Sequence, residues 1–241
     1  MLRWIVLLSL YSIVIAWLLP QFPSEFHKSR KVVVPEDATY SCQNINFQAA
    51  QYQFNEALNI TPPELTWRNV SQFAQQLRRF VGNSTNNFLT TCYYRTRFYK
   101  QLGATYSSCI NRYYLLTQLK AGDNPTAAFE YPDLWSQLDF ACNAGLQFAI
   151  ADWYKLQSTK SHDAVENCTR SFFNNSTFNG PDQFCAALPT YLTCLTTHYL
   201  SIVDPTDVVG AWYWCEEARV VFNYDCPTTR CYVGANATFF Q

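Results

Sequence analysis

Residues 85–119, TNNFLTTCYYRTRFYKQLGATYSSCINRYYLLTQL, decide the fold class of this chain. Apolar and cysteine side chains recur along the stretch every three or four residues, which is the spacing of one face of an amphipathic helix. These residues are Phe88, Cys92, Tyr99, Leu102, Tyr106, Cys109, Tyr113 and Leu116. Gly103 is the one expected interruption, so the stretch forms one long helix or two. Cys92 and Cys109 would lie roughly 25 Å apart on an unbroken helix, which is too far for a disulfide.

Helical patterns also cover most of the chain on either side of this stretch. We predict helices at 47–58, within 61–80 after a Thr61-Pro62 start, and at 132–153, 163–173, 181–203 and 208–222. Pro132-Asp133 opens the third of these after a loop at 120–131, Pro189 kinks or restarts the fifth, and Asp207 caps the last. The chain has only seven glycines, too few for a turn-rich β architecture. The predicted fold is all-α, a disulfide-stapled bundle of about six to eight helices.

The composition indicates a folded domain with a large core. The chain has 241 residues, of which 49% are hydrophobic, 17% aromatic and 15% charged, and this is unlike a disordered chain. The formal net charge is -1, whereas a nucleic-acid-binding protein usually carries a basic excess. We therefore expect one cysteine-rich helical domain at 36–241 and no nucleic-acid partner.

The N-terminus has the pattern of a targeting segment. Arg3 precedes an apolar stretch, and Val14-Ile15-Ala16 places small residues where a signal peptidase cleaves. We predict a signal peptide at 1–16 and a stem or pro-segment at 17–35, in which Arg30-Lys31 is a possible processing site. Because apolar character continues to Leu19, the alternative is an uncleaved anchor, and only that alternative brings contact with a membrane.

Asn-X-Ser/Thr sequons agree with export. The predicted N-glycosylation sites are Asn59, Asn69, Asn83, Asn167, Asn174, Asn175 and Asn236. The adjacent pair at 174 and 175 is expected to carry a single glycan. Each used site must lie at the surface of the folded protein.

The cysteines predict a disulfide framework. The ten are Cys42, Cys92, Cys109, Cys142, Cys168, Cys185, Cys194, Cys215, Cys226 and Cys231. An even number in an exported chain favours disulfides, here up to five bridges of undetermined pairing. No Cys-x2-Cys spacing occurs, so neither a zinc site nor a thioredoxin-like redox motif is indicated. We expect the last two cysteines to pin the C-terminal tail to the helices.

One segment resembles a known group of proteins. Residues 184–194, FCAALPTYLTC, are similar to the Cys-x8-Cys helical signature of secreted cysteine-rich domains that are abundant in nematodes. Cys215, Cys226 and Cys231 follow it in the same style. The resemblance extends at most over 85–235. It implies a helical, secreted domain but no activity and no site residues, because the function of those domains is generally unknown.

Catalytic motifs are missing from the sequence. There is no nucleophile elbow, zinc-protease helix, phosphate-binding glycine loop or EF-hand. His162 and His198 are the remaining candidates for a general base, and both fit a packing or surface position better. The acid pairs that might act on a glycoside are Glu216 with Glu217, Asp204 with Asp207, and Asp133 with Asp139. Helix caps account for Asp133 and Asp207, and adjacent glutamates on a helix point about 100° apart. We predict no catalytic residue, no metal site and no cofactor.

Two surface features bear on binding. Consecutive rings in Trp212-Tyr213-Trp214 and Tyr113-Tyr114 point in different directions on a helix, so some lie at the rim of the core or on an exposed patch. The basic residues Arg95, Arg97 and Lys100 are expected to form a solvated face.

The sequence therefore favours a secreted, extracellular, N-glycosylated and disulfide-rich protein that is not an enzyme and binds an unknown extracellular protein. The alternative is an extracellular carrier of a lipid or another apolar small molecule, which needs an enclosed apolar cavity of several hundred Å³.

Overall fold

The computed structural model describes residues 19, 20, 22, 26, 40–156, 161–174 and 181–232, without the side chains of 161–164, 174 and 181. All regular secondary structure in this part of the chain is helical, which confirms the predicted all-α fold class. The predicted signal peptide and the Arg30-Lys31 pair lie outside the described residues. Among the helices described, none combines the length and the apolar character needed to cross a membrane.

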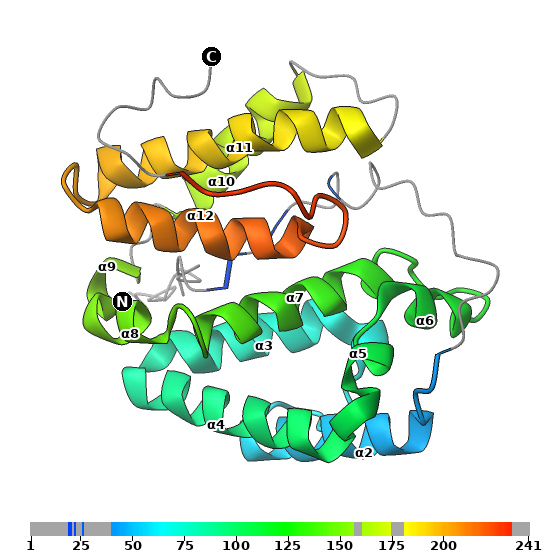
Figure 1. The fold of residues 1–241 in the computed structure, drawn as a ribbon. Coiled ribbons are helices and arrows are strands. Elements are labelled where there is room, and N and C mark those ends of the chain that lie inside the picture. The colour runs from blue at the N-terminus through cyan, green and yellow to red at the C-terminus, as the bar shows by residue number, and fades with distance from the viewer. Residues whose placement is uncertain are drawn as a thin grey trace, which may run out of the picture.

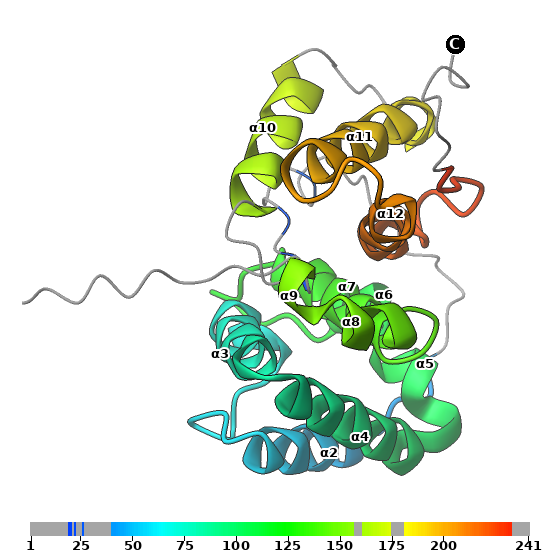
Figure 2. The same cartoon turned by 90° about the vertical axis from the view of Figure 1, so that its left-hand side faces the viewer.

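The helices form two layers, which Figures 1 and 2 show from two directions. The first layer contains α2 (Asn44–Ala57), α3 (Val70–Asn83), α4 (Thr85–Leu102), α5 (Tyr106–Cys109), α6 (Arg112–Thr117), α7 (Ala127–Ala141), α8 (Leu146–Ala151) and α9 (Trp153–Leu156). The second layer contains α10 (Ser161–Asn174), α11 (Pro181–Ile202) and α12 (Val208–Phe222). Short 3-10 turns, η1 (Trp67–Asn69) and η2 (Gly103–Thr105), join elements of the first layer. Helices α7 and α12 pack against each other where the layers meet.

The helical stretch predicted at 85–119 is interrupted at Gly103, where the sequence predicted an interruption. Helix α4 ends before Gly103, whose φ of 53° is a conformation that side chains with a Cβ rarely adopt. The chain then turns through η2 into the short α5 and α6. Within α4 the core-facing rings are Phe88 and Phe98, while Tyr99, predicted on the core stripe, lies half exposed against Tyr106. The prediction for Tyr99 was wrong because the core lies toward Phe98 and Leu102 rather than on the side of Tyr99.

Two predicted helix starts were wrong. Helix α7 begins at Ala127 and passes through Pro132 instead of starting there. The residues before the proline are buried, including Phe129 and Tyr131, and this burial compensates for the hydrogen bond that proline removes. Helix α3 begins at Val70 rather than near Thr61, because the Gln76 side chain binds the backbone N–H and C=O of Thr61 at 2.8 and 2.6 Å and holds it outside the helix. Helix α11 continues through Pro189.

The segment expected to be a stem contributes to the core. Leu19, Pro20, Phe22 and Phe26, which we call the N-terminal strap, are buried. The Phe26 ring lies 4.8 Å from the Tyr191 ring and 5.1 Å from the Phe222 ring, measured between centroids. The folded domain therefore extends further toward the N-terminus than the predicted boundary at residue 36. The aromatic side chains explain the difference, since exposing such large rings to water would be unfavourable.

Candidate functional site

The cysteines are all structural. The bridges are Cys42–Cys109, Cys92–Cys142, Cys168–Cys194, Cys185–Cys226 and Cys215–Cys231. No cysteine is free, which confirms the predicted disulfides and leaves no thiolate for nucleophilic or metal chemistry. The last two bridges hold the tail after α12 to α11 and α12, as the sequence predicted.

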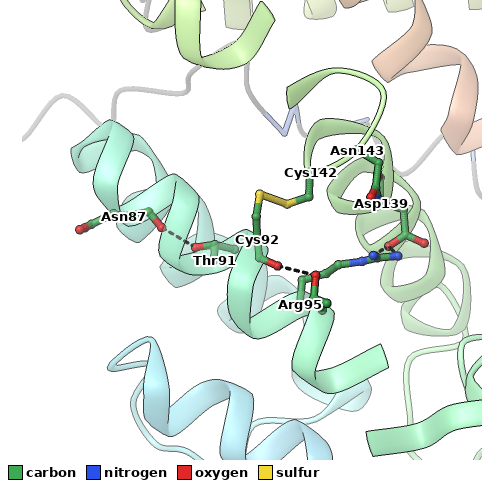
Figure 3. Close-up of a disulfide and its surroundings, with 8 residues drawn as sticks. Asn87, Thr91, Cys92, Arg95, Asp139, Cys142 and Asn143 are labelled. Atoms are coloured by element: carbon green, nitrogen blue, oxygen red, sulfur yellow. Dashed lines mark hydrogen bonds and ion pairs between the residues drawn. A yellow bond between two sulfur atoms is a disulfide. The ribbon is translucent and has the colours of Figure 1, made fainter. Parts of the chain in front are cut away.

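Figure 3 shows how one disulfide bridge and a partly buried ion pair join the same two helices. Cys92 on α4 is bonded to Cys142 directly after α7, and Arg95 forms an ion pair with Asp139 on α7. The Tyr106 hydroxyl donates a further hydrogen bond to Asp139 at 3.2 Å. Burial raises the pKa of Asp139 despite the opposing effect of the Arg95 charge. Arg95 is therefore not part of a solvated basic face, and its role is to join α4 to α7.

The described sequons lie at the surface. Asn59, Asn69, Asn83 and Asn167 are all exposed, so each position can accommodate a glycan. The side chains of Asn174, Asn175 and Asn236 lie outside the described part of the structure. Glycosylation itself stays a prediction.

Of the two histidine candidates for a general base, His198 is the one whose side chain is described, and it lies beside a disulfide. His198 is half buried beside the Cys168–Cys194 bridge, and its ring nitrogen and the two sulfur atoms lie within 4.8 Å of one another. Sulfur atoms in a disulfide are not thiolates, so this group does not have the ligands of a zinc site. The side chain of His162 lies outside the described residues.

One candidate acid pair meets at a lysine. Lys155 Nζ lies 2.9 Å from Asp207 and 3.5 Å from Asp204. Asp207 also accepts a 2.8 Å hydrogen bond from the Gly210 N–H and so caps α12, as predicted. Burial raises the pKa of Asp207, but the hydrogen bonds from Lys155 and Gly210 outweigh it and leave the pKa below its ordinary value. The arrangement fixes the start of α12 and does not leave two acids facing a substrate.

The other acid pairs are separated by their partners. Asp139 is held by Arg95, whereas Asp133 lines a small pocket beside the N-terminal strap. Glu216 forms an ion pair with Arg219 at 2.8 Å. Glu217, its neighbour, points into the interior and is fully buried.

The aromatic runs identified in the sequence lie largely in the core. Tyr213 and Trp214 are buried and Trp212 is half buried. Tyr114 is buried, and Tyr113 packs against Tyr224. The exposed rings are scattered tyrosines, namely Tyr52, Tyr93, Tyr99, Tyr154, Tyr224 and Tyr232. Tyr93 on α4, which was not part of any predicted feature, is one of them.

A groove between α2 and α4 is the clearest candidate binding surface. It has a volume of about 340 Å³, and the buried side chains of Ala50, Phe54 and Phe98 form its floor. Its remaining lining comes from Gln53, Glu56, Ala57, Tyr94, Arg97 and Gln101. The two helices run in opposite directions (Figure 1). Asn59 follows the end of α2 in the chain, and Asn83 precedes the start of α4.

Aromatic and basic side chains stand beside this groove. Tyr93 is 60% exposed, and its ring lies edge-on to the Tyr94 ring with 5.1 Å between centroids. The Arg97 guanidinium lies 5.8 Å from the Tyr94 ring centroid, and Leu89, one turn before Tyr93, is also exposed. Helix α4 contains three basic residues and no acidic one. With Arg95 paired to Asp139, the exposed charge of α4 comes from Arg97 and Lys100. The signal in the sequence was the tyrosine pair at 93–94, beside the core stripe.

The pockets give the carrier alternative no support. The α2–α4 groove has an apolar floor, but most of the residues at its rim are polar and exposed. A pocket beside the strap, lined by Pro20, Phe22 and Leu134 among others, holds only about 30 Å³, enough for one or two water molecules.

Comparison of the chain with known protein families, with curated proteins and with solved structures finds no match. The resemblance of residues 184–194 to nematode secreted domains therefore stays a prediction. The fold defines the class as a disulfide-stapled helical bundle, and the function has to be argued from its surfaces.

Proposed function

We propose that this protein is a secreted, N-glycosylated interaction protein without catalytic activity, and that the α2–α4 groove binds an extracellular protein. The observation that carries the proposal is the exposed Tyr93, whose ring packs against Tyr94 in the groove lining, together with the exposed Arg97 of the same lining. Tyrosine and arginine are enriched among the residues that contribute most to protein–protein affinity. Five disulfides are compatible with an extracellular location.

The charge of the surface suggests the chemistry of the partner. Arg97 and Lys100 are exposed on α4, while Glu56 is the acidic residue in the groove lining. The partner surface is accordingly acidic, with apolar or aromatic side chains that pack against Tyr93 and Leu89. The polar rim suits a protein segment better than a lipid chain, which prefers a predominantly apolar enclosure.

The test compares the double variant Tyr93→Ala/Arg97→Ala with wild type on an array of purified extracellular domains, followed by measurement of Kd for each bound domain. Removing hot-spot side chains weakens the free energy of binding by about 2 kcal/mol or more. The Kd of the double variant should therefore be about thirtyfold higher than that of wild type. Tyr154→Ala is the matched control, because Tyr154 is 91% exposed on α9, outside the groove. Equal binding by the double variant and wild type would refute the groove as the binding surface.

Export is tested separately. The full chain, expressed with its own N-terminus in a eukaryotic cell line, should appear in the medium and lose mass on treatment with an N-glycosidase. Substituting Gln at Asn59, Asn69, Asn83 and Asn167 should reduce that loss stepwise. A chain that stays inside the cell and carries no glycan would contradict the proposed location.

A further inference from the structure

Helices α10 and α11 bring a histidine to one of the five disulfide bridges. The Sγ atoms of Cys168 and Cys194 and a ring nitrogen of His198 all lie within 4.8 Å of one another. Cys168 is 1% exposed, whereas Cys194 and His198 are half buried. In the part of the chain that the structure describes, this is the one group of three histidine, cysteine or acidic residues close enough to share a metal ion.

The positions of the three residues on their helices suit a metal ion. Cys194 and His198 are four residues apart on α11, so their side chains lie on the same face, one turn from each other. Cys168 approaches that face from α10. His198 accepts a hydrogen bond from Ser201 through its backbone carbonyl, and in the described part of the chain its ring has no hydrogen-bond partner. The ring is therefore available as a ligand.

Only the disulfide bond separates this group from a set of zinc ligands. While closed, the bridge is structural, and its sulfur atoms carry no charge with which to bind a metal ion. Opening the bridge would supply two thiolates beside an imidazole, a combination that zinc prefers and that leaves a fourth position for water. Neighbouring ligand atoms in a tetrahedral zinc site are about 3.5–4 Å apart. Atoms that already lie within 4.8 Å of one another can reach this spacing through small side-chain rotations.

Packing beside the bridge would keep α10 and α11 together after the bridge opens. One helical turn away, the Phe172 ring on α10 lies 5.5 Å from the Tyr191 ring on α11, measured between centroids. The Thr169 and Tyr191 hydroxyls lie 3.5 Å apart and share a hydrogen bond. The Cys168–Cys194 bridge also closes a sequence separation of only 26, whereas three of the other bridges close separations of 41 to 67. Opening the shorter loop releases less conformational freedom.

We propose that the Cys168–Cys194 bridge is a redox-gated zinc site, in which reduction releases two thiolates that bind one Zn²⁺ together with His198. The reductant is a dithiol of the thioredoxin class. One of its thiolates attacks the half-buried Cys194 sulfur, forms a mixed disulfide and displaces Cys168 as a thiolate. The second thiolate of the reductant attacks the reductant's own sulfur in that mixed disulfide and releases Cys194. The bridge gains two electrons, and the reductant is oxidised to a disulfide.

Binding of the ion would hold the bridge open. Both sulfur atoms are then coordinated as thiolates, which neutralise the charge of Zn²⁺, while His198 binds as a neutral imidazole. The fourth position belongs to a water molecule on the side of the half-buried Cys194 and His198. The site lies in the second layer, apart from the α2–α4 groove, so its success or failure does not bear on the proposed partner binding.

The test uses Co²⁺ as a spectroscopic probe for Zn²⁺ on the purified full chain. The protein is reduced with a limiting amount of dithiothreitol, freed of reductant without oxygen, and titrated with Co²⁺. Alkylation and peptide mass mapping of the same sample show which bridge has opened. We expect the opened protein to bind one Co²⁺ per chain with thiolate-to-cobalt charge-transfer absorption, and Zn²⁺ to displace it. The oxidised protein should not show this absorption.

A ligand variant and a matched control identify the site. His198→Ala removes the imidazole and should weaken Co²⁺ binding by at least about tenfold, because even partners that only orient a ligand contribute that much to metal affinity. Thr197→Ala alters the exposed neighbour on the same helix and should bind Co²⁺ as wild type does. Equal affinity in wild type and His198→Ala would overturn the inference, because the ion would then be bound elsewhere.

A further variant covers the case in which reduction unfolds the protein. Cys168→His removes the bridge and places an imidazole opposite Cys194 and His198, while the other four bridges stay closed. This variant should bind Co²⁺ without any reductant and lose that binding when combined with His198→Ala. Absence of Co²⁺ binding in both the reduced wild type and Cys168→His would overturn the inference. A bridge that opens only when circular dichroism shows loss of the helices would overturn the redox gate.

Discussion

Replacing Phe26 by alanine tests whether the N-terminal strap belongs to the folded domain. Phe26 is 0% exposed, and its ring lies within 5.1 Å, between centroids, of the rings of Phe173, Tyr191 and Phe222. Removing a fully buried phenylalanine side chain costs about 3–5 kcal/mol, from lost burial and from the cavity left behind. The same substitution in a solvated stem would change the free energy of unfolding by less than about 0.5 kcal/mol.

The assay is equilibrium unfolding in guanidinium chloride under non-reducing conditions, followed by tryptophan fluorescence. Phe26→Ala should lower the midpoint with an unchanged m-value, because the variant loses stability without changing the surface exposed on unfolding. Tyr154→Ala, which truncates a ring that is 91% exposed, should leave the midpoint within error. A loss below about 1 kcal/mol for Phe26→Ala would refute the packing of Phe26 among α10, α11 and α12.

Further predictions concern one disulfide bridge and one helix cap. Replacing Cys92 and Cys142 together by alanine opens a loop with a sequence separation of 50, and should cost about 4 kcal/mol in the same unfolding assay; an unchanged midpoint would contradict this. Asp207→Ala removes the acceptor of the Gly210 N–H and the partner of Lys155, and should cost about 1–2 kcal/mol at neutral pH. Because the folded-state pKa of Asp207 lies below its ordinary 3.8, this contribution is present above that value and is lost as the pH falls through the lowered pKa. Unfolding measured from pH 7 to pH 2 should show the variant and wild type converging, and a constant difference would contradict the assignment.

Features that depend on neighbouring residues could be predicted from the sequence. Gly103 ends a helix and Asp207 starts one, as expected, because a cap or a break is decided within a turn of the chain. The prediction from Pro132 was wrong because it used only a local preference. Proline favours a helix start, but the residues before it are buried, and α7 includes them and continues past Pro132.

The candidate sites were only partly visible in the sequence. Tyr93 and Arg97 belong to a predicted helix, but whether they face the core or solvent depends on how α2 packs against α4. The sequence indicated Glu217 only as half of an acid pair on a helix. Its burial depends on Leu19, which is 198 residues away in the chain.

By itself, the sequence determined that this chain is helical, cysteine-rich and free of recognised catalytic motifs, because composition, periodicity and caps are local or additive properties. The tertiary structure decided which cysteines pair, that the strap is buried, and that the Glu217 carboxylate lies in the interior. These outcomes depend on contacts between segments far apart in the chain. Such contacts form only when whole faces pack together, and no local preference specifies their partners.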